Sequence, residues 1–308
     1  MRRNDYDVTD TIRTTDPKAV GAEVERIYLG LYNSPPTRLQ RAFRDAAKLY
    51  RGEDPEYLPC DTGYHDLQHV LDVTLAMARL MDGYQRGGRQ GSEKPLPRDF
   101  FVIGILAALF HDFGYLRRRN DRRHRYGAEY TLIHVSRGAA YLRGYARSLG
   151  LHELARTGSI LVHYTGYERA AETIRIADPL LRRVGHMLGT ADIIAQMSDR
   201  CYLEKCRDRL YPEFVLGGLA VRKGNGRKLP NFTSSEDLLH KTPEFYEHAQ
   251  RRLDVQLSRA YEYATVHFGG RNPYIEEMQK NVRHAQELAK SESMDRLRRS
   301  PPTTLVSS

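Results

Sequence analysis

Two histidines four residues apart, and a later His-Asp pair, are the residues of this sequence best suited to metal or proton chemistry. His65 and His69 stand in the segment YHDLQHVLDV, so both side chains project from one face if a helix begins there. His111 and Asp112 follow directly on Phe100–Phe110, an uninterrupted run of eleven apolar residues. An aspartate is almost never fully buried unless it is paired or binds a metal ion, and the apolar run leaves little solvent for this one.

Three further side chains could complete a metal site. His134 in TLIHVS, His163 in SILVHY and Asp192 in GTADIIAQM each lie among apolar residues in stretches that we expect to be helical. Each also has an ordinary explanation, as a hydrogen-bonded core histidine or as an aspartate that caps a helix or forms a buried salt bridge. The intervals from Asp112 through His134 and His163 to Asp192 are 22, 29 and 29 residues, and helical hairpins return the chain to one level at about such intervals. Mixed imidazole and carboxylate ligands in one cavity would suit Zn, Mn or Fe(II), and one carboxylate could bridge two ions.

The elements that would position these residues are helices. Apolar residues recur three and four apart from Asp16 onward, and no alternating run of β-branched residues extends beyond a few positions. We therefore expect an all-α bundle with additional N- and C-terminal helices, and an exposed loop at 217–236. The expected organisation is N-terminal helices at 1–55 that pack on the core, the core at 56–215, a C-terminal loop and helices at 216–295 that complete the same domain, and a disordered tail at 296–308.

Composition narrows the class of protein. The chain has 308 residues and 40% of them are hydrophobic, which excludes wholesale disorder. The longest apolar run is well short of the roughly 20 residues that a membrane-spanning helix needs, and no secretory signal is apparent. Three cysteines without metal-ligand spacing favour a reducing cytoplasm. A net charge of +9 suits an anionic partner, but it does not distinguish a nucleic acid, a nucleotide and a phospholipid headgroup.

The doublet His111-Asp112 resembles the one that gives its name to the HD-domain metal-dependent phosphohydrolase superfamily. The resemblance covers roughly residues 60–200, about half of the chain, and implies an HD-domain helical bundle. In addition, the segment that contains His65 and His69 is similar to the YHNxxHxxDV motif of class I cyclic-nucleotide phosphodiesterases. In that family the first histidine of the motif is the general acid and the second is a metal ligand, which implies these roles here. The chain departs from the motif by carrying an aspartate, residue 66, in place of the asparagine.

The resemblance also implies how the remaining ligands are shared. Asp112 and Asp192 would complete the first metal site, while His134 and His163 fall where two-metal proteins of the HD-GYP type supply histidines to a second metal. The GYP extension itself is absent, so cyclic dinucleotides are not implied as substrates. The HDxxED pattern of alarmone hydrolases is also absent, which disfavours alarmones as substrates. A further departure is Tyr115, which stands where the phosphodiesterase pattern HDxxHPG has its second histidine.

The implied reaction is hydrolysis of a small phosphodiester, with a 3′,5′-cyclic nucleotide as the favoured substrate. Two divalent ions (Zn, Mg, Mn or Fe) about 3.5–4 Å apart would activate a hydroxide. Asp112 would bridge the ions, and His65 would protonate the leaving alkoxide. The candidate substrate-binding residues are Tyr64, Arg118, Arg122 and Gln196. Two simpler interpretations stay open. The arginine-rich stretch 117–125 could be a solvated loop, and Gln196 could merely add polar surface to the lining of the site.

Other functions also stay open from the sequence. A nucleotidase or phosphomonoesterase of the same superfamily would use the same metals, and a di-iron HD oxygenase would use the histidines of the second metal. A non-enzymatic nucleotide-binding protein would need only a structural metal, and would not require His65. We expect a cytoplasmic protein with a small phosphorylated partner, such as a nucleotide, and with neither a membrane nor a nucleic acid as partner. A homodimer is left open.

Overall fold

The protein is built from helices, which confirms the all-α class that the hydrophobic spacing predicts. The computed structural model describes residues 2–88, 94–166, 169–224, 227–291 and 296–304. The longer helices are α1 (Pro17–Tyr32), α2 (Thr37–Arg51), α3 (Leu67–Gly88), α4 (Arg98–Phe110), α5 (His134–Ser148), α6 (His152–Leu161), α7 (Pro179–Ser198), α11 (Thr242–Arg251) and α13 (Pro273–Ser291).

Short helical segments connect or extend these helices. The short α-helices are α8 (Tyr202–Lys205), α9 (Tyr211–Leu216), α10 (Ser235–His240) and α12 (Glu262–His267). Turns of 3₁₀-helix occur at η1 (Phe113–Tyr115), η2 (Gly127–Tyr130), η3 (Val162–Tyr164) and η4 (Ala171–Thr173), and turns of π-helix at η5 (Cys206–Leu210) and η6 (Arg252–Gln256).

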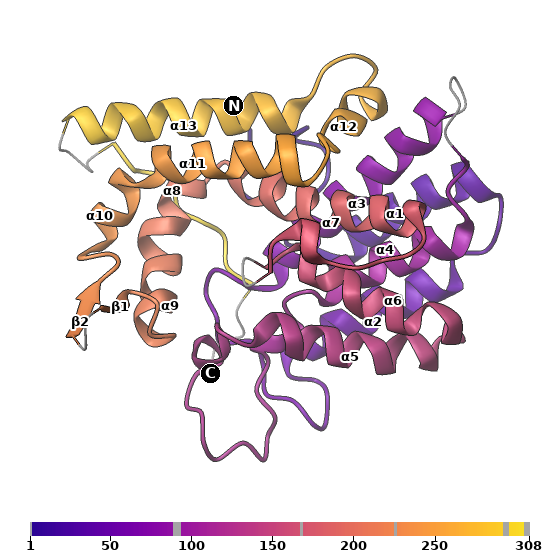
Figure 1. The fold of residues 1–308 in the computed structure, drawn as a ribbon, viewed down its shortest axis with the longest axis horizontal. Coiled ribbons are helices and arrows are strands. Elements are labelled where there is room, and N and C mark those ends of the chain that lie inside the picture. Colours follow the sequence, from indigo (N-terminus) through magenta and orange to yellow (C-terminus); the bar gives the residue numbers. More distant parts are fainter. Residues whose placement is uncertain (1, 89–93, 167–168, 225–226, 292–295, 305–308) are drawn as a thin grey trace.

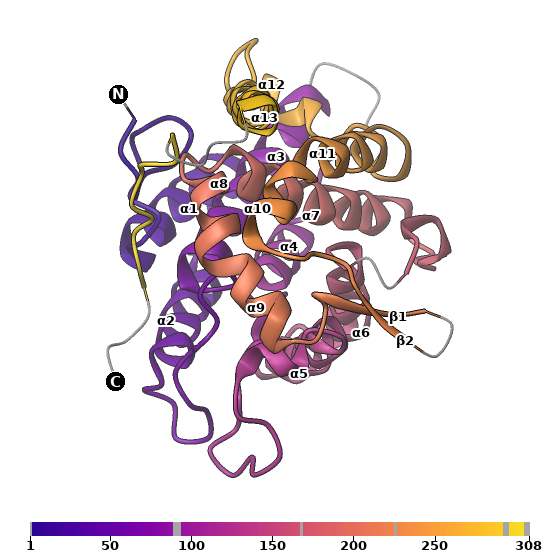
Figure 2. The ribbon, with the colours of Figure 1, turned by 90° about the vertical axis from the view of Figure 1, so that its left-hand side faces the viewer.

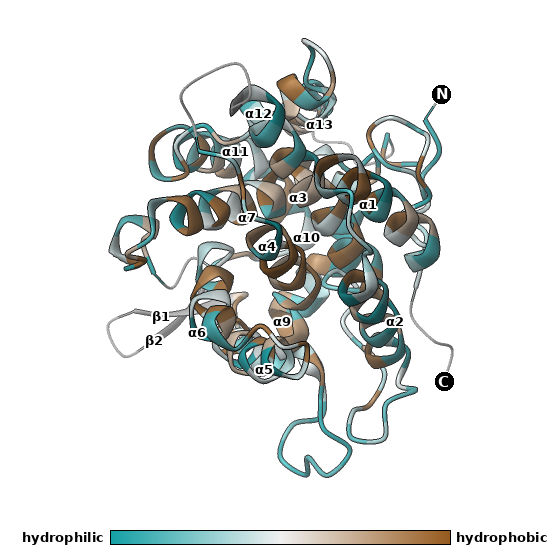
Figure 3. Ribbon diagram, turned by 90° about the vertical axis from the view of Figure 1, so that its right-hand side faces the viewer, coloured by the Kyte–Doolittle hydropathy of each residue, from teal (hydrophilic) through white to brown (hydrophobic). Residues whose placement is uncertain are grey.

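Helix α4 lies at the centre of the fold. All of its residues from Phe101 to Phe110 are buried, and α2, α3, α5, α6 and α7 pack around it. Figure 3 shows α4 as a strongly hydrophobic helix with the other helices on its sides. A helix that is apolar all round can be stable only when it is covered all round. The residues that directly follow Phe110 therefore lie in the interior of the protein.

The C-terminal part of the chain covers one end of this bundle. Helix α13 packs along α7 and α11, and α12 packs on α3, while α9 and α10 lie at the left of Figure 1. One connected hydrophobic core includes residues from Val20 to Leu297. None of the described helices is both long and apolar enough to cross a membrane.

The segment 217–236 is not entirely the loop that the sequence predicts. Its described part contains a small antiparallel hairpin, β1 (Val221–Gly224) paired with β2 (Arg227–Pro230), next to α9 in Figure 2. Each strand has four residues, and the pair contacts no third strand among the described residues. Because such a hairpin cannot form a core of its own, it leaves the all-α class unchanged.

The C-terminal residues 296–304 follow a defined path along the core, although the sequence predicts a disordered tail from 296 to 308. Leu297 is buried, and the Arg209 guanidinium donates to the carbonyl oxygens of Pro301 and Pro302 at 2.9 and 2.6 Å. The Thr304 hydroxyl donates to Asp66 Oδ2 at 2.9 Å. Residues 305–308 lie outside the described part of the chain. The tail thus reaches the loop that precedes α3.

The close packing of α5 on the end of α4 generates a first prediction. A methyl group at Gly138 would lie 2.6 Å from the carbonyl oxygen of His111, whereas nothing lies within 4 Å of the same position at Gly144 in the same helix. We expect Gly138→Ala to lower the free energy of unfolding by about 1–3 kcal/mol, because the end of α4 must move. Gly144→Ala should raise it by about 0.5–1 kcal/mol. Urea denaturation measures both changes, and similar effects of the two variants would contradict this packing.

Candidate metal centre

The candidate ligands come from the ends of two helices and the interior of a third. His69 lies in the first turn of α3, where its backbone N–H donates to Asp66 Oδ1 at 3.0 Å. His111 and Asp112 directly follow the last residue of α4, and Asp192 lies within α7. Helices α3, α4 and α7 all pack against one another. Side chains that are far apart in the sequence therefore meet at one buried point.

Three of these side chains form a group that could hold a metal ion. The Nε2 atoms of His69 and His111 are 3.3 Å apart, and Asp112 Oδ2 lies 3.3 and 3.1 Å from them. All three residues are buried, and their ligand atoms lie within 4.8 Å of one another. Asp192 Oδ1 approaches the same point, at 3.4 Å from His69 Nε2 and 3.9 Å from His111 Nε2.

The hydrogen bonds of the group fit a bound cation. His111 Nδ1 lies 2.8 Å from the carbonyl oxygen of Ala108, and a carbonyl can only accept, so Nε2 is left with its lone pair facing the group. Asp112 Oδ2 is buried and has no hydrogen-bond partner among the described residues. A carboxylate oxygen and imidazole lone pairs that converge on one point repel each other unless a cation or a proton lies between them. Nitrogen and oxygen ligands of this kind suit Zn, Mn or Fe(II).

The negative charge of the group acts strongly on its histidines. Burial alone lowers the pKa of His69, but Asp112 and Asp192 outweigh burial and raise this pKa to about 10. The His111 imidazole has a pKa raised in the same way, chiefly by Asp112. The pKa of Asp112 lies well below its usual range despite burial, because His111 and His65 stabilise its charged form. The centre thus attracts positive charge.

The two remaining predicted ligands, His134 and His163, differ in their position relative to the three-residue group. His134 is the first residue of α5, and its Nε2 lies 3.6 Å from Asp112 Oδ1, whereas His69 and His111 lie near Oδ2 of the same carboxylate. His134 Nδ1 lies 2.6 Å from the carbonyl oxygen of Thr131, which again leaves Nε2 as the free ligand atom. His163 is buried in η3, outside the three-residue group. Asp112 therefore has one oxygen near His69 and His111 and the other near His134.

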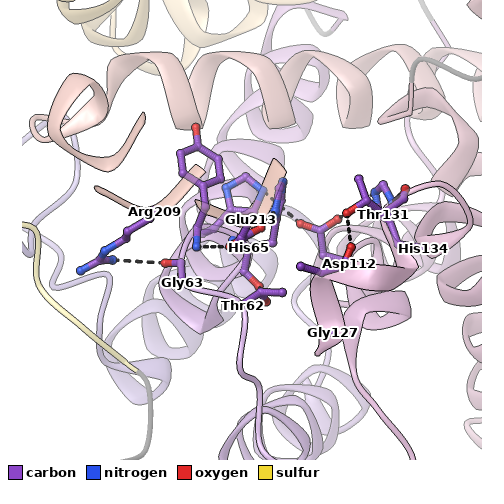
Figure 4. A network of polar contacts seen from close by, with 12 residues as sticks. Thr62, Gly63, His65, Asp112, Gly127, Thr131, His134, Arg209 and Glu213 are labelled. Carbon is purple, nitrogen blue, oxygen red and sulfur yellow. Dashed lines mark hydrogen bonds and ion pairs between the residues drawn. The ribbon is translucent and has the colours of Figure 1, made fainter. Parts of the chain in front are cut away.

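A glutamate that the sequence analysis did not identify holds the proposed general acid. His65 Nδ1 lies 2.6 Å from Oε2 of Glu213, a buried residue of α9, and Oε1 of the same carboxylate accepts from the backbone N–H groups of Tyr64 and His65. Figure 4 shows this pair beside Asp112. Burial lowers the pKa of His65, but Glu213 and Asp112 raise it above its ordinary value. No local pattern in the sequence marks Glu213 as a functional residue, because it is an ordinary acidic residue in the first turn of a short helix.

Tyr115, a departure from the family pattern, separates two of the histidines. Its ring stacks on His65 at a centroid distance of 4.7 Å and an interplanar angle of 17°, and on His134 at 4.4 Å and 21°. The backbone at Gly114 touches that of His134 so closely that any side chain there would clash with it. A tyrosine at position 115 thus fills the space between the general-acid candidate and the start of α5.

The centre opens into a cavity of about 530 Å³. Two of the four predicted substrate-binding residues line it, and Tyr64 Oη donates to Gln196 Oε1 at 3.1 Å. Arg118 and Arg122 are both exposed and are not among the lining residues. The Arg118 guanidinium instead lies over the ring of Tyr57.

The arginine-rich stretch 117–125 is partly tied to a neighbouring loop. Arg117 forms an ion pair with Asp61 at 3.0 Å, and Arg119 donates to the carbonyl oxygen of Gly52 at 2.7 Å. Arg118 lies 3.7 Å from Glu56 in an exposed pair. These contacts favour the simpler interpretation of this stretch as a solvated loop.

The sequence matches no known protein-family model, and it matches no curated protein. The interpretation of the centre therefore depends on the residues and distances given above.

The buried histidine at the end of α4 gives a second prediction. We expect the protein to bind zinc or manganese, and His111→Ala to retain less than about a tenth of the metal, because a buried site missing one ligand binds far more weakly. The matched control is His152→Ala, which removes an exposed histidine at the start of α6. Metal content after dialysis, measured by mass spectrometry, decides the outcome. Equal metal in His111→Ala and in the control would contradict the assignment.

Proposed function

We propose that the protein is a metal-dependent phosphohydrolase that cleaves small phosphodiesters, such as a 3′,5′-cyclic nucleotide. The observation that carries this proposal is the presence, at one end of a single cavity, of a group that could bind a cation and of a histidine held by a carboxylate. His69 and Asp112 belong to the first, His65 and Glu213 to the second, and His65, His69 and Asp112 line the cavity. A site that only held a structural metal would not need the second pair.

The chemistry divides between the centre and the histidine. A divalent cation bound there would polarise a phosphoryl oxygen and lower the pKa of a bound water to near neutrality. Glu213 fixes the His65 ring through Nδ1 and favours its protonated form, so that Nε2 is a donor. An alkoxide is a poor leaving group, and a protonated imidazole close to the phosphate can supply the proton that it needs.

A second metal belongs to the same proposal. Asp112 Oδ1 and His134 Nε2 are 3.6 Å apart, and the other oxygen of this carboxylate is the one near His69 and His111. An ion held by this pair, together with His163 as the family resemblance implies, would share Asp112 with the first. Paired ions stabilise both the attacking and the departing oxygen in phosphoryl transfer.

The role of His65 gives a third prediction, which depends on the leaving group. His65→Ala should reduce kcat/KM for cyclic AMP or cyclic GMP by about 100- to 10,000-fold, because the departing alkoxide needs a proton. The same variant should lose much less activity on bis(p-nitrophenyl) phosphate, whose leaving group is stable without one. Both substrates are assayed with Mg, Mn and Zn, and metal content is measured in parallel.

Two controls make this test decisive. His65→Ala must retain the metal content of the wild-type protein, and His248→Ala, which removes a largely exposed histidine of α11, should leave both activities unchanged. Equal losses on both substrates would contradict the general-acid role. Hydrolysis of phosphomonoesters alone would overturn the phosphodiesterase proposal in favour of a phosphomonoesterase.

A further inference from the structure

The same cavity is also lined by apolar residues that are not part of the metal centre, and we call the part of the cavity that they line the outer chamber. Its wall is formed by six apolar side chains: Leu210, Phe214, Leu219, Phe232, Leu238 and Phe245. These come from α9, α10, α11 and the segments next to them, and the rings of Phe214 and Phe232 stack at 5.7 Å with an interplanar angle of 18°. Apart from α9, which also carries Glu213, these elements contribute no residue to the centre described above.

The polar side chains of the outer chamber are already engaged with the protein. Lys241 Nζ lies 2.9 Å from Asp237 Oδ2 and donates to the carbonyl oxygen of Asn231. The Asn231 side-chain amide donates to the carbonyl oxygen of Leu219, and the Thr242 hydroxyl donates to that of Leu238. Lys241 is the only lysine or arginine among the described lining residues. The chamber therefore offers little polar or cationic surface to a ligand.

The mouth of the cavity is apolar as well. Leu132 lines the cavity and is 75% exposed, and Phe245 lines it and is 37% exposed. Large apolar side chains that are exposed at the rim of a cavity mark a site where an apolar ligand group enters. A ribose or a second phosphate would lose its hydration in this chamber without gaining hydrogen bonds, which is costly.

We infer that the outer chamber binds an apolar substituent of the substrate, an alkyl or aryl group carried by the phosphate ester. The preferred substrates are then phosphodiesters that bear such a group, and the base of a cyclic nucleotide is a poorer occupant. This inference rests on the proposed function, because the ester phosphate must lie at the metal centre for its substituent to enter the chamber. It goes further by naming the chemical class of the substrate.

The test uses the full-length protein loaded with Mn²⁺ and a series of alkyl p-nitrophenyl phosphates, from methyl to octyl. In this reaction the oxygen of water bonds to phosphorus, the bond from phosphorus to the nitrophenolate oxygen breaks, and the proton of the water passes to solvent. We expect kcat/KM to rise about fourfold per methylene until the chamber is filled, since each buried methylene gains a nearly constant transfer free energy.

A pair of matched variants connects this trend to the chamber. Phe232→Ala removes a wall side chain and should reduce the ratio of kcat/KM for the octyl ester to that for the methyl ester by about tenfold. Val255→Ala removes a 73% exposed side chain of η6 that does not line the cavity, and it should leave the ratio unchanged. A ratio that is the same in both variants would overturn the inference.

Other outcomes are equally decisive. A kcat/KM that is independent of chain length overturns the inference but leaves the proposed function intact. So does a kcat/KM for cyclic AMP above that for the octyl ester, with the same dependence on Phe232, because the chamber would then be a base site. If no ester is hydrolysed, the proposed function fails, and calorimetry tests the chamber separately. Octyl phosphate should bind more tightly than methyl phosphate, with a negative heat-capacity change, and equal affinities would overturn the inference.

Discussion

The carboxylate of Asp112, buried at the end of an apolar helix, is the constraint on which the rest of the site depends. Helix α4 is covered on all sides, so the two residues that follow it are buried, and Asp112 is only 3% exposed. Burying an isolated carboxylate costs far more than a typical protein's stability allows, unless positive charge is brought to it. His69, His111 and His134 approach it from α3, α4 and α5. The packing of these helices therefore determines how charged groups are arranged around the buried carboxylate of Asp112.

The histidines are held in place by groups that are not themselves candidate ligands. The backbone carbonyl groups of Ala108, near the end of α4, and of Thr131, directly after η2, fix the rings of His111 and His134. The loop before α3 is held from the C-terminal half, by Glu213 at His65 and by Arg209 and Thr304 at Asp66. The C-terminal helices and the tail are therefore part of the site, because the loop that carries His65, the proposed general acid, has its polar partners there.

The sequence predicted the parts of the site that depend on local pattern. An apolar run followed by a doublet, and two histidines four apart at a helix start, were enough to bring His69, His111 and Asp112 together on an all-α framework.

Glu213 was missed because its partner His65 lies 148 residues away and no local feature marks it. Arg118 is predicted near the substrate because it follows the doublet closely in sequence, yet the structure has it over Tyr57, because residues 117 and 119 form backbone hydrogen bonds with residues 58 and 56. The apolar chamber could not be predicted either, because its wall is assembled from short elements whose relative placement depends on tertiary packing.

The polar end and the apolar wall of the cavity affect each other. Apolar side chains line the same cavity as these charged groups, and charges flanked by apolar groups interact through a lower effective dielectric than charges in bulk water. The ion pair of His65 with Glu213 and the field of Asp112 are therefore stronger than they would be in an open cleft. A fully polar ligand would have to give up its hydration along the wall, whereas a ligand with one apolar arm gives up only water that was unfavourable to it. The apolar wall thus strengthens the electrostatic interactions of the centre and also selects the ligands that can bind there.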